Sequence, residues 1–477
     1  MTVERQALAG LKWVAIAKLS SQIISWAATL LVMRLLVPAD YGLMAMVTVV
    51  IAVLTNVAEL GIGAAVIQAP KVSSEELAKI SGLILLTSIA AFVLLVLGAP
   101  LISWIYGVER LTLLIQVAAS QFLISGIATL PQALAQRTFE FRRLAGIELG
   151  SVLASSFATL GLAWYGAGVW SLVLGSLTGA AVRTLMLATG GLVRPSFRLA
   201  GVRKFLAVGG AVMFGRLTWQ IVYQSDVLIG ARRLGVTEIG AYSVALQLAT
   251  LPMQRIMSVL NQVALPAVAR LQDDTERLRQ RLVEASRLLA AVSVPMMWGI
   301  SAIAPELVRV VLGQKWGDAV FPLQAISLIV PLRMISATFS TATLGIGRAG
   351  LDFRNNVVTA IVLPSAFFAG TFWGVDGLAA SWLAAIPLVF ALNFPRVARA
   401  LSITVGDVAR AVWRALAAGV AMYLAVVALR TALGETPELV RLPVLIGAGA
   451  IVYVGVLQAM DRSIGRDLIR LARGDRS

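Results

Sequence analysis

The sequence predicts an all-helical, polytopic membrane protein with about fourteen spanning helices, arranged as two parallel, pseudo-symmetric six-helix lobes and two C-terminal helices. Three observations lead to this fold class. The composition is too apolar for a water-soluble domain, about fourteen stretches are long enough to cross a bilayer, and a polar motif recurs 198 positions further along the chain.

The composition excludes most soluble and enzymatic classes. Of the 477 residues, 59% are hydrophobic and 13% are charged, against about 25% charged residues in a typical soluble domain. The chain contains no Cys and no His, which excludes disulfides, Cys/His metal sites and catalysis that depends on histidine. We therefore expect a protein that is not an enzyme and that has no metal and no cofactor.

Apolar stretches of about 20 residues mark the spans. The N-terminal stretch is too long for a signal-peptide core and has no A-x-A cleavage pattern, so it predicts a retained first helix. The first and seventh spans are the most polar. The predicted spans are 11–36, 40–67, 80–103, 111–135, 147–165, 168–190, 205–230, 239–264, 286–310, 320–344, 357–373, 376–395, 413–430 and 442–460.

The formal net charge of +16 has two readings, a nucleic-acid partner or the excess of Lys and Arg that membrane proteins keep in cytoplasmic loops. Most of the 40 Lys and Arg residues fall in segments on the same side as the N-terminus and in the C-terminal tail. This placement favours the second reading and excludes a nucleic-acid partner. It predicts a multi-pass membrane protein with both termini in the cytoplasm. The segment 265–285 predicts a short amphipathic helix on the cytoplasmic surface.

A repeat supports the two lobes. Residues 18–23 align with residues 216–221 in charge, hydroxyl and amide positions, and Asp40-x-Gly42 aligns with Glu238-x-Gly240. Six spans separate the copies, so both enter the membrane in the same direction. The predicted lobes are residues 1–200 and 201–400, and residues 401–477 hold two additional helices and a basic tail.

Two such lobes predict a central cavity that opens to one side at a time, as in secondary transporters. No G-x-x-x-x-G-K-[ST] loop for nucleotide hydrolysis is present. Charges inside spans are costly, so they mark the wall of such a cavity. The first and seventh helices each carry a polar stripe on one face, formed by Lys18, Ser21, Gln22, Ser25 and Thr29 and by Arg216, Trp219, Gln220, Tyr223 and Asp226.

Alternatives stay open for each of these charges. Lys18 and Arg216 can also extend to the cytoplasmic headgroups. Arg333 lies mid-span, where that reach is difficult, and the alternative for it is an ion pair within one lobe. Glu59 and Arg255 can pair across the cavity, or Glu59 can simply be a carboxylate at a helix end.

The excess of cations in the predicted cavity favours an anion such as a phosphate or diphosphate, and the amide, hydroxyl and aromatic residues suit a sugar. Seven residues are predicted to bind the substrate: Lys18, Gln22, Arg216, Gln220, Tyr223, Arg255 and Arg333.

Three segments carry a family resemblance: VMRLLVPADYGLMAMVTV, ELGIGAAVIQ and QSDVLIGARRLGVTEIGAYSVALQLATLP. They resemble the polysaccharide-transporter branch of the multidrug/oligosaccharidyl-lipid/polysaccharide flippase superfamily, in particular flippases of O-antigen (lipopolysaccharide) and exopolysaccharide repeat units. The resemblance implies movement of undecaprenyl-diphosphate-linked oligosaccharide from the cytoplasmic to the periplasmic leaflet. It also implies ion coupling in some members, for which Glu59 and Asp226 are the candidates here, and it suggests the polysaccharide polymerase and chain-length machinery as partners.

Two other classes compete with this interpretation. A multidrug or small-solute exporter of the same superfamily is the nearer one, but an exporter of cationic drugs needs an acidic cavity. A membrane polymerase or glycosyltransferase needs a large outer loop, whereas the predicted outer turns have about ten residues or fewer.

Overall fold

The computed structural model describes residues 22, 24–59, 66, 67, 69, 72–198, 217, 220–270 and 274–461. Within those ranges all regular structure is helical, and ten helical segments are long and apolar enough to cross a membrane. The all-helical, polytopic fold class is therefore confirmed. The chain divides into two compact units, Met1–Gly240 and Ala241–Ser477, and the predicted lobe limits near residues 200 and 400 stay a prediction.

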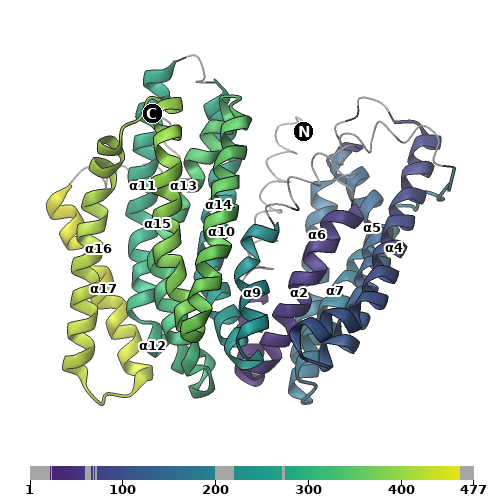
Figure 1. Ribbon diagram of the computed structural model, residues 1–477, viewed down its shortest axis with the longest axis horizontal. Coiled ribbons are helices and arrows are strands. Elements are labelled where there is room, and N and C mark those ends of the chain that lie inside the picture. Colours follow the sequence, from purple (N-terminus) through teal and green to yellow (C-terminus); the bar gives the residue numbers. More distant parts are fainter. Residues whose placement is uncertain are drawn as a thin grey trace, which may run out of the picture. The chain divides into compact units, whose positions relative to one another are not determined.

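Unit 1 is a bundle of long helices that run alongside one another (Figure 1). Helices α6 and α7, α4 and α5, and α5 and α7 are its closest neighbours, and α2 packs on α4 and α5. Its helices are an apolar helix over Ile24–Leu35, α2 (Pro38–Glu59), α4 (Ser74–Tyr106), α5 (Arg110–Arg137), α6 (Phe141–Trp164), α7 (Val169–Ala188), α9 (Ser225–Arg233) and the start of α10 (Val236–Arg270).

Local sequence signals set the ends of α4. The hydroxyl of Ser73 accepts the N–H of Glu76 at 3.2 Å, and the Glu76 carboxylate accepts the N–H of Ser73 at 2.9 Å, which is a capping box. Gly107 ends the helix in the left-handed conformation, with φ 68°. The helix therefore begins six residues before the predicted span at residue 80, because the capping residues lie outside the apolar stretch.

The two copies of the repeated motif meet in unit 1. A Cβ on Gly42 would overlap the carbonyl oxygen of Val236, and a Cβ on Gly240 would overlap the carbonyl oxygen of Pro38. The contact is reciprocal, because position 236 corresponds to position 38 in the 198-residue shift. Only glycine permits two backbones to approach this closely, so the repeated glycines serve the crossing of α2 with the start of α10.

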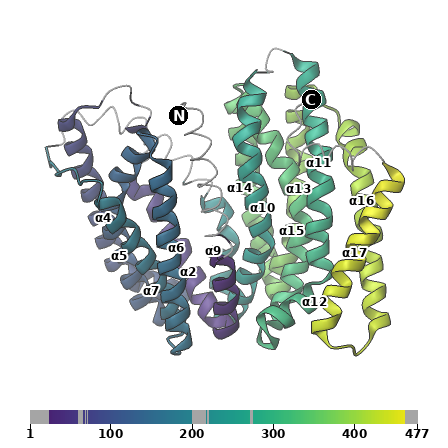
Figure 2. The ribbon, with the colours of Figure 1, turned by 180° about the vertical axis from the view of Figure 1, so that it is seen from behind.

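Unit 2 contains the remaining helices. Helix α11 packs on α13 and α16, α13 packs on α15, and α14 pairs with α15. The view from behind shows α16 and α17 beside α11 at the edge of this unit (Figure 2). Its elements after α10 are α11 (Thr275–Ala302), α12 (Ala304–Leu307), η1 (Val308–Leu312), η2 (Gln314–Ala319), α13 (Val320–Gly345), α14 (Ala349–Gly370), η3 (Thr371–Trp373), α15 (Gly374–Leu401), α16 (Val405–Leu433) and α17 (Glu438–Met460).

The prediction of a separate surface helix over 265–285 is wrong. Residues 265–270 finish α10, and residues from Thr275 onward form the first turns of the 28-residue α11. The charged residues of these turns form ion pairs along one helix, such as Arg279 with Glu276 at 2.8 Å. They extend a spanning helix beyond its apolar part, and this produces the amphipathic pattern without a separate helix.

A buried carboxylate fastens α16 and α17 to the rest of unit 2. Glu306 of α12 is 0% exposed and forms ion pairs with Arg430 of α16 at 2.8 Å and with Arg441 of α17 at 3.2 Å. Beside it, Glu438 of α17 pairs with Arg309 at 3.0 Å.

The opposite ends of the same helices carry a second set of ion pairs. Asp461, just after α17, forms ion pairs with Arg414 of α16 at 2.6 Å and with Arg287 of α11 at 3.5 Å. Asp407 of α16 forms an ion pair with Arg279 of α11 at 3.1 Å. The pair of helices is thus tied to α11 at one end and to α12 at the other.

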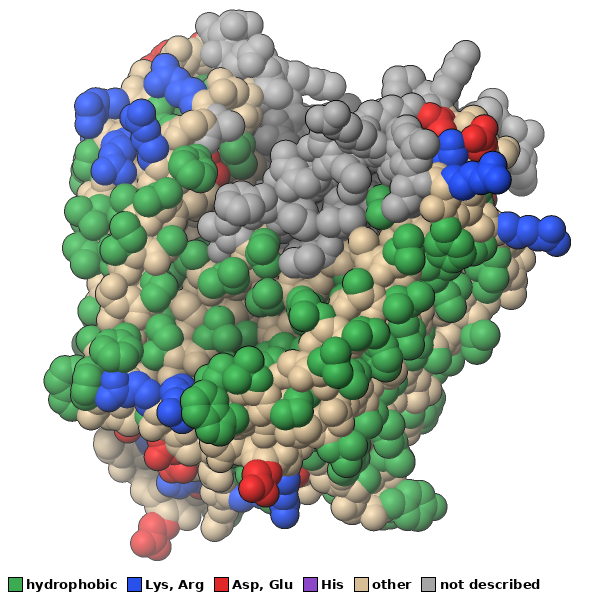
Figure 3. Space-filling model, turned by 45° about the vertical axis from the view of Figure 1, so that its right-hand side comes forward, with side chains coloured by type: hydrophobic (Ala, Val, Ile, Leu, Met, Phe, Trp, Pro, Cys, Tyr) green, Lys and Arg blue, Asp and Glu red, His purple; other side chains and the backbone are tan. Residues whose placement is uncertain are grey.

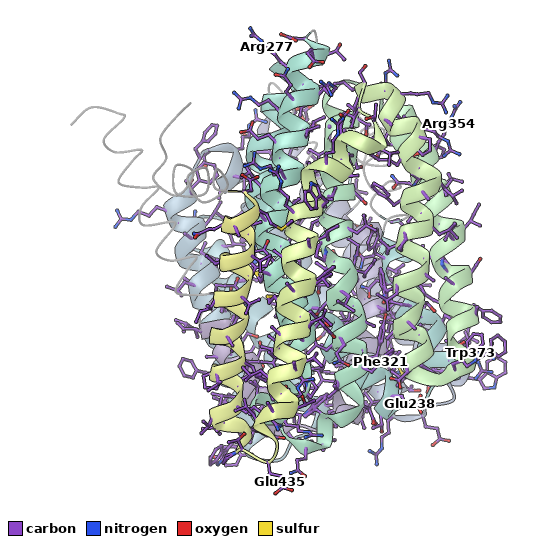
Figure 4. All side chains as sticks on the ribbon, turned by 90° about the vertical axis from the view of Figure 1, so that its left-hand side faces the viewer. Glu238, Arg277, Phe321, Arg354, Trp373 and Glu435 are labelled. Atoms are coloured by element: carbon purple, nitrogen blue, oxygen red, sulfur yellow. The ribbon has the colours of Figure 1, made fainter. Side chains whose placement is uncertain are left out.

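The surface follows the pattern of a membrane protein. Figure 3 shows hydrophobic side chains across the middle of one face, with charged side chains gathered toward its two ends. In unit 2, Arg277 and Arg354 lie at one end of the helices, and Trp373 and Glu435 lie at the other (Figure 4). An apolar band between two polar ends is the surface that a bilayer requires.

Candidate functional site

Unit 1 contains a partly open polar cavity of about 520 Å³ between α2, α4, α5, α6 and α7. Its wall is unusual for helices of this hydropathy, because hydroxyl and carboxamide side chains outnumber apolar ones. The polar lining residues are Thr55, Ser88, Gln121, Ser125, Thr129, Gln132, Ser151, Ser155, Ser176, Arg183 and Thr184.

Small residues bring the helices around this cavity close together. A Cβ on Gly126 of α5 would overlap the hydroxyl of Ser88 on α4, and a Cβ on Gly179 of α7 would meet Ser155 of α6 at 2.9 Å. Glycines opposite serines are the usual means of close helix packing in membranes. The same serines line the cavity, so the close contacts also place its hydroxyl groups.

One ion pair stands at the cavity wall. Arg183 of α7 donates to the carboxylate of Glu148 on α6 at 2.9 Å, and their side chains are 37% and 47% exposed. The two residues match in depth because α6 and α7 form an antiparallel hairpin, with Glu148 near the start of one helix and Arg183 near the end of the other. Opposite charges at equal depth in consecutive spans are a sequence signal that could have predicted this pair.

Arg333 lies at the middle of α13 in unit 2, stacked over an aromatic ring. Its guanidinium carbon is 4.4 Å from the centroid of Trp382 on α15. The indole of Trp382 is buried and donates to the hydroxyl of Tyr242 on α10 at 2.7 Å, and its ring packs on Phe367 at 4.9 Å. These contacts hold the ring in place, and its face offers the guanidinium a cation–π contact.

The other predicted site residues divide into two groups. Lys18 and Arg216, and the side chains of Glu59 and Arg255, lie outside the described residues. Gln22, Gln220 and Tyr223 are half-buried, and Asp226 is fully buried in α9, where its carboxylate accepts the N–H of Val227 at 2.7 Å. Of the predicted residues that are described, Gln220, Tyr223 and Asp226 lie together on consecutive turns of unit 1, and Arg333 belongs to unit 2.

Comparison of the sequence with known proteins identifies a family and several relatives. A family model described as polysaccharide biosynthesis protein matches residues 31–321. The lipopolysaccharide biosynthesis protein WzxC of Escherichia coli is 26% identical over 80% of this chain and 79% of its own length. The succinoglycan biosynthesis transport protein ExoT of Rhizobium meliloti is 24% identical over 97% of this chain and 94% of its own.

Solved structures agree on the fold. The lipid II flippase MurJ in an inward closed conformation superimposes with a TM-score of 0.78 at 15% identity, over 96% of this chain and 99% of that one. An inward-facing multidrug transporter of the MATE family superimposes with a TM-score of 0.59 at 15% identity, over 81% of this chain and 98% of that one. Because the family model covers more than half of the residues, the chain belongs to the polysaccharide biosynthesis protein family.

Proposed function

We propose that this protein is a flippase that moves undecaprenyl-diphosphate-linked oligosaccharide repeat units from the cytoplasmic to the periplasmic leaflet of a bacterial inner membrane. The repeat units serve the synthesis of a surface polysaccharide, either O-antigen or exopolysaccharide. The observation that carries the proposal is the match over 97% of this chain to a relative named for transport in succinoglycan biosynthesis. The fold shared with a lipid II flippase adds to it.

In this proposal the substrate crosses through a basic central cavity by alternating access, with both chain termini in the cytoplasm. Lys18, Arg216, Arg255 and Arg333 attract the diphosphate, since fixed cations in a medium of low dielectric constant hold an anion strongly. Three neutral residues contact the sugar: Gln22, Gln220 and Tyr223. Two acidic residues, Glu59 and Asp226, couple transport to an ion. The polysaccharide polymerase and chain-length proteins act on the product.

The experiment is a deletion strain complemented with variants. The deletion should abolish the surface polymer and leave lipid-linked repeat units on the cytoplasmic side of the membrane. Normal polymer in the deletion strain would contradict the proposal. Resistance to cationic drugs that disappears with the gene, at normal polymer, would instead favour the multidrug exporter whose fold this chain shares.

Arg333 offers the sharpest variant because its position is described. Arg333→Ala should abolish the polymer at normal protein level, whereas Arg333→Lys should retain part of it, because lysine keeps the charge and loses the flat stacking on Trp382. Arg354→Ala is the matched control, since Arg354 is exposed at the end of α14 (Figure 4). Equal amounts of surface polymer in Arg333→Ala and Arg354→Ala would contradict the assignment of Arg333 to the substrate site.

A further inference from the structure

The cavity of unit 1 offers a ligand many hydrogen-bond acceptors. Five of its hydroxyl groups donate their hydrogen to main-chain carbonyl oxygens of their own or a neighbouring helix. A hydroxyl has one hydrogen and two lone pairs, so each of these oxygens can only accept from a ligand. The donors are Thr55 to Ile51 at 2.8 Å, Thr129 to Ser125 at 2.9 Å, Ser151 to Glu148 at 2.9 Å, Ser176 to Val173 at 2.7 Å and Thr184 to Ile124 at 3.0 Å.

Two carboxamides on α5 supply the complementary groups. Gln121 and Gln132 line the cavity eleven positions apart, which is about three helical turns, so they share one face with Ser125 and Thr129. Neither amide forms a hydrogen bond to any other part of the chain that the structure describes. Each offers two N–H donors and one carbonyl acceptor to whatever enters.

The described part of the cavity wall carries little net charge. Arg183 is the only charged residue among the described residues of its wall, and Glu148 neutralises it at 2.9 Å. An anion would have to compete with that carboxylate for the guanidinium. A neutral molecule that both donates and accepts hydrogen bonds meets no such cost.

The dimensions and the remaining wall also suit a sugar ring. A volume of about 520 Å³ falls in the usual range of small-molecule sites, roughly 300–1,000 Å³. Ile84, Phe122 and Val152 supply apolar surface, against which the C–H face of a pyranose can lie while its hydroxyls point to the polar side chains. A purely apolar ligand would leave the polar groups without partners.

We propose that this cavity is a binding site for an uncharged sugar ring of the glycan. The hydroxyls of the ring donate to the Ser and Thr oxygens and accept from the amides of Gln121 and Gln132. The inference rests on the proposed function and adds to it a site for the glycan inside unit 1.

The test uses the absence of cysteine from the natural chain. Ser155→Cys places one thiol on the cavity wall of the full-length purified protein, and Thr189→Cys places one at an exposed position beyond the end of α7. The probe is the repeat-unit glycan released by mild acid from the lipid-linked pool of the native strain. At about ten times its dissociation constant, it should slow maleimide labelling of Ser155→Cys about tenfold and leave Thr189→Cys unchanged.

Further arms separate the outcomes. Inorganic pyrophosphate should give no protection, and Gln121→Leu or Gln132→Leu in the Ser155→Cys background should weaken protection by the glycan. Protection by pyrophosphate and not by glycan would show an anion site instead, and protection by neither would show a solvated cavity only. Either result overturns the proposal.

The labelling experiment and the deletion strain fail independently. If the deletion leaves the polymer intact while the glycan protects Ser155→Cys, the flippase function is wrong and the sugar site stands. If the deletion abolishes the polymer while the glycan gives no protection, the function stands and the sugar site is wrong.

Discussion

Removing the carboxylate of Glu306 should release α16 and α17 from unit 2. In Glu306→Gln an amide nitrogen can take the place of the carboxylate oxygen that accepts from Arg430 at 2.8 Å and lies 3.2 Å from the Nε of Arg441. The side chain keeps its shape, so the perturbation is the loss of one negative charge. Arg430 and Arg441 then face each other with their exposed fractions at only 22% and 13%.

The magnitude follows from distance and burial. Two unit charges about 4 Å apart interact by about 4 kcal/mol at an effective dielectric constant near 20. Measured losses on removing one partner of a buried ion pair are about 3–5 kcal/mol, because an uncompensated charge stays behind. We therefore expect Glu306→Gln to lower the free energy of unfolding by about 3–5 kcal/mol.

The assay is unfolding of the purified protein in mixed micelles by increasing SDS, followed by tryptophan fluorescence. Glu435→Gln is the control, since Glu435 is exposed in the turn between α16 and α17 (Figure 4). A triple variant, Glu306→Leu with Arg430→Met and Arg441→Leu, should return to within about 1 kcal/mol of the natural protein, because no buried charge remains. A Glu306→Gln variant as stable as the control, or a triple variant as unstable as Glu306→Gln, would refute the reasoning.

Three further predictions concern contacts within single units. Gly42→Ala should lower the free energy of unfolding by about 1–3 kcal/mol, because the added methyl group meets a main-chain carbonyl. Gly447 faces open space, so Gly447→Ala should leave the free energy of unfolding unchanged. Equal effects of the two substitutions in SDS unfolding would exclude the close crossing of α2 and α10. Asp40→Ala should lower the free energy of unfolding by about 1–3 kcal/mol in the same assay, since the carboxylate accepts the N–H of Val169, the first residue of α7, at 3.0 Å. An unchanged midpoint of SDS unfolding would contradict this. Trp382→Phe should lower the free energy of unfolding by about 1–3 kcal/mol, because it leaves the buried hydroxyl of Tyr242 without the indole N–H. A double variant that also carries Tyr242→Phe should recover part of this loss of stability. Failure to recover it would show that packing of the indole dominates.

The sequence could predict the helices because each span needs a long apolar run, and a run is visible in one dimension. It predicted their ends less well. Ser73 and Thr404 start α4 and α16 by capping boxes that lie in polar sequence, before the apolar runs begin. The charged first turns of α11 resemble a surface helix for the same reason, since a polar extension of a span and an amphipathic helix share one sequence pattern.

The candidate site was harder to predict because its parts are distant in the chain. Arg333 stood out as a charge in mid-span, but nothing in the sequence pairs it with Trp382 rather than with any other aromatic residue. The hydroxyls of the cavity in unit 1 were invisible for another reason. Serine and threonine in membrane helices can bond to their own backbone whether they face a cavity or lipid, so only the packing of helices such as α5 and α7 distinguishes the two cases.

The attachment of α16 and α17 at both ends also determines how this part of the protein meets bilayers of different thickness. Helix α17 has 23 residues and is therefore about 35 Å long, while the hydrocarbon layer is about 30 Å thick. A free helix pair would accommodate a thinner bilayer by tilting. Ion pairs to α11 and to α12 oppose that tilt, so the lipid around these two helices has to stretch or compress instead.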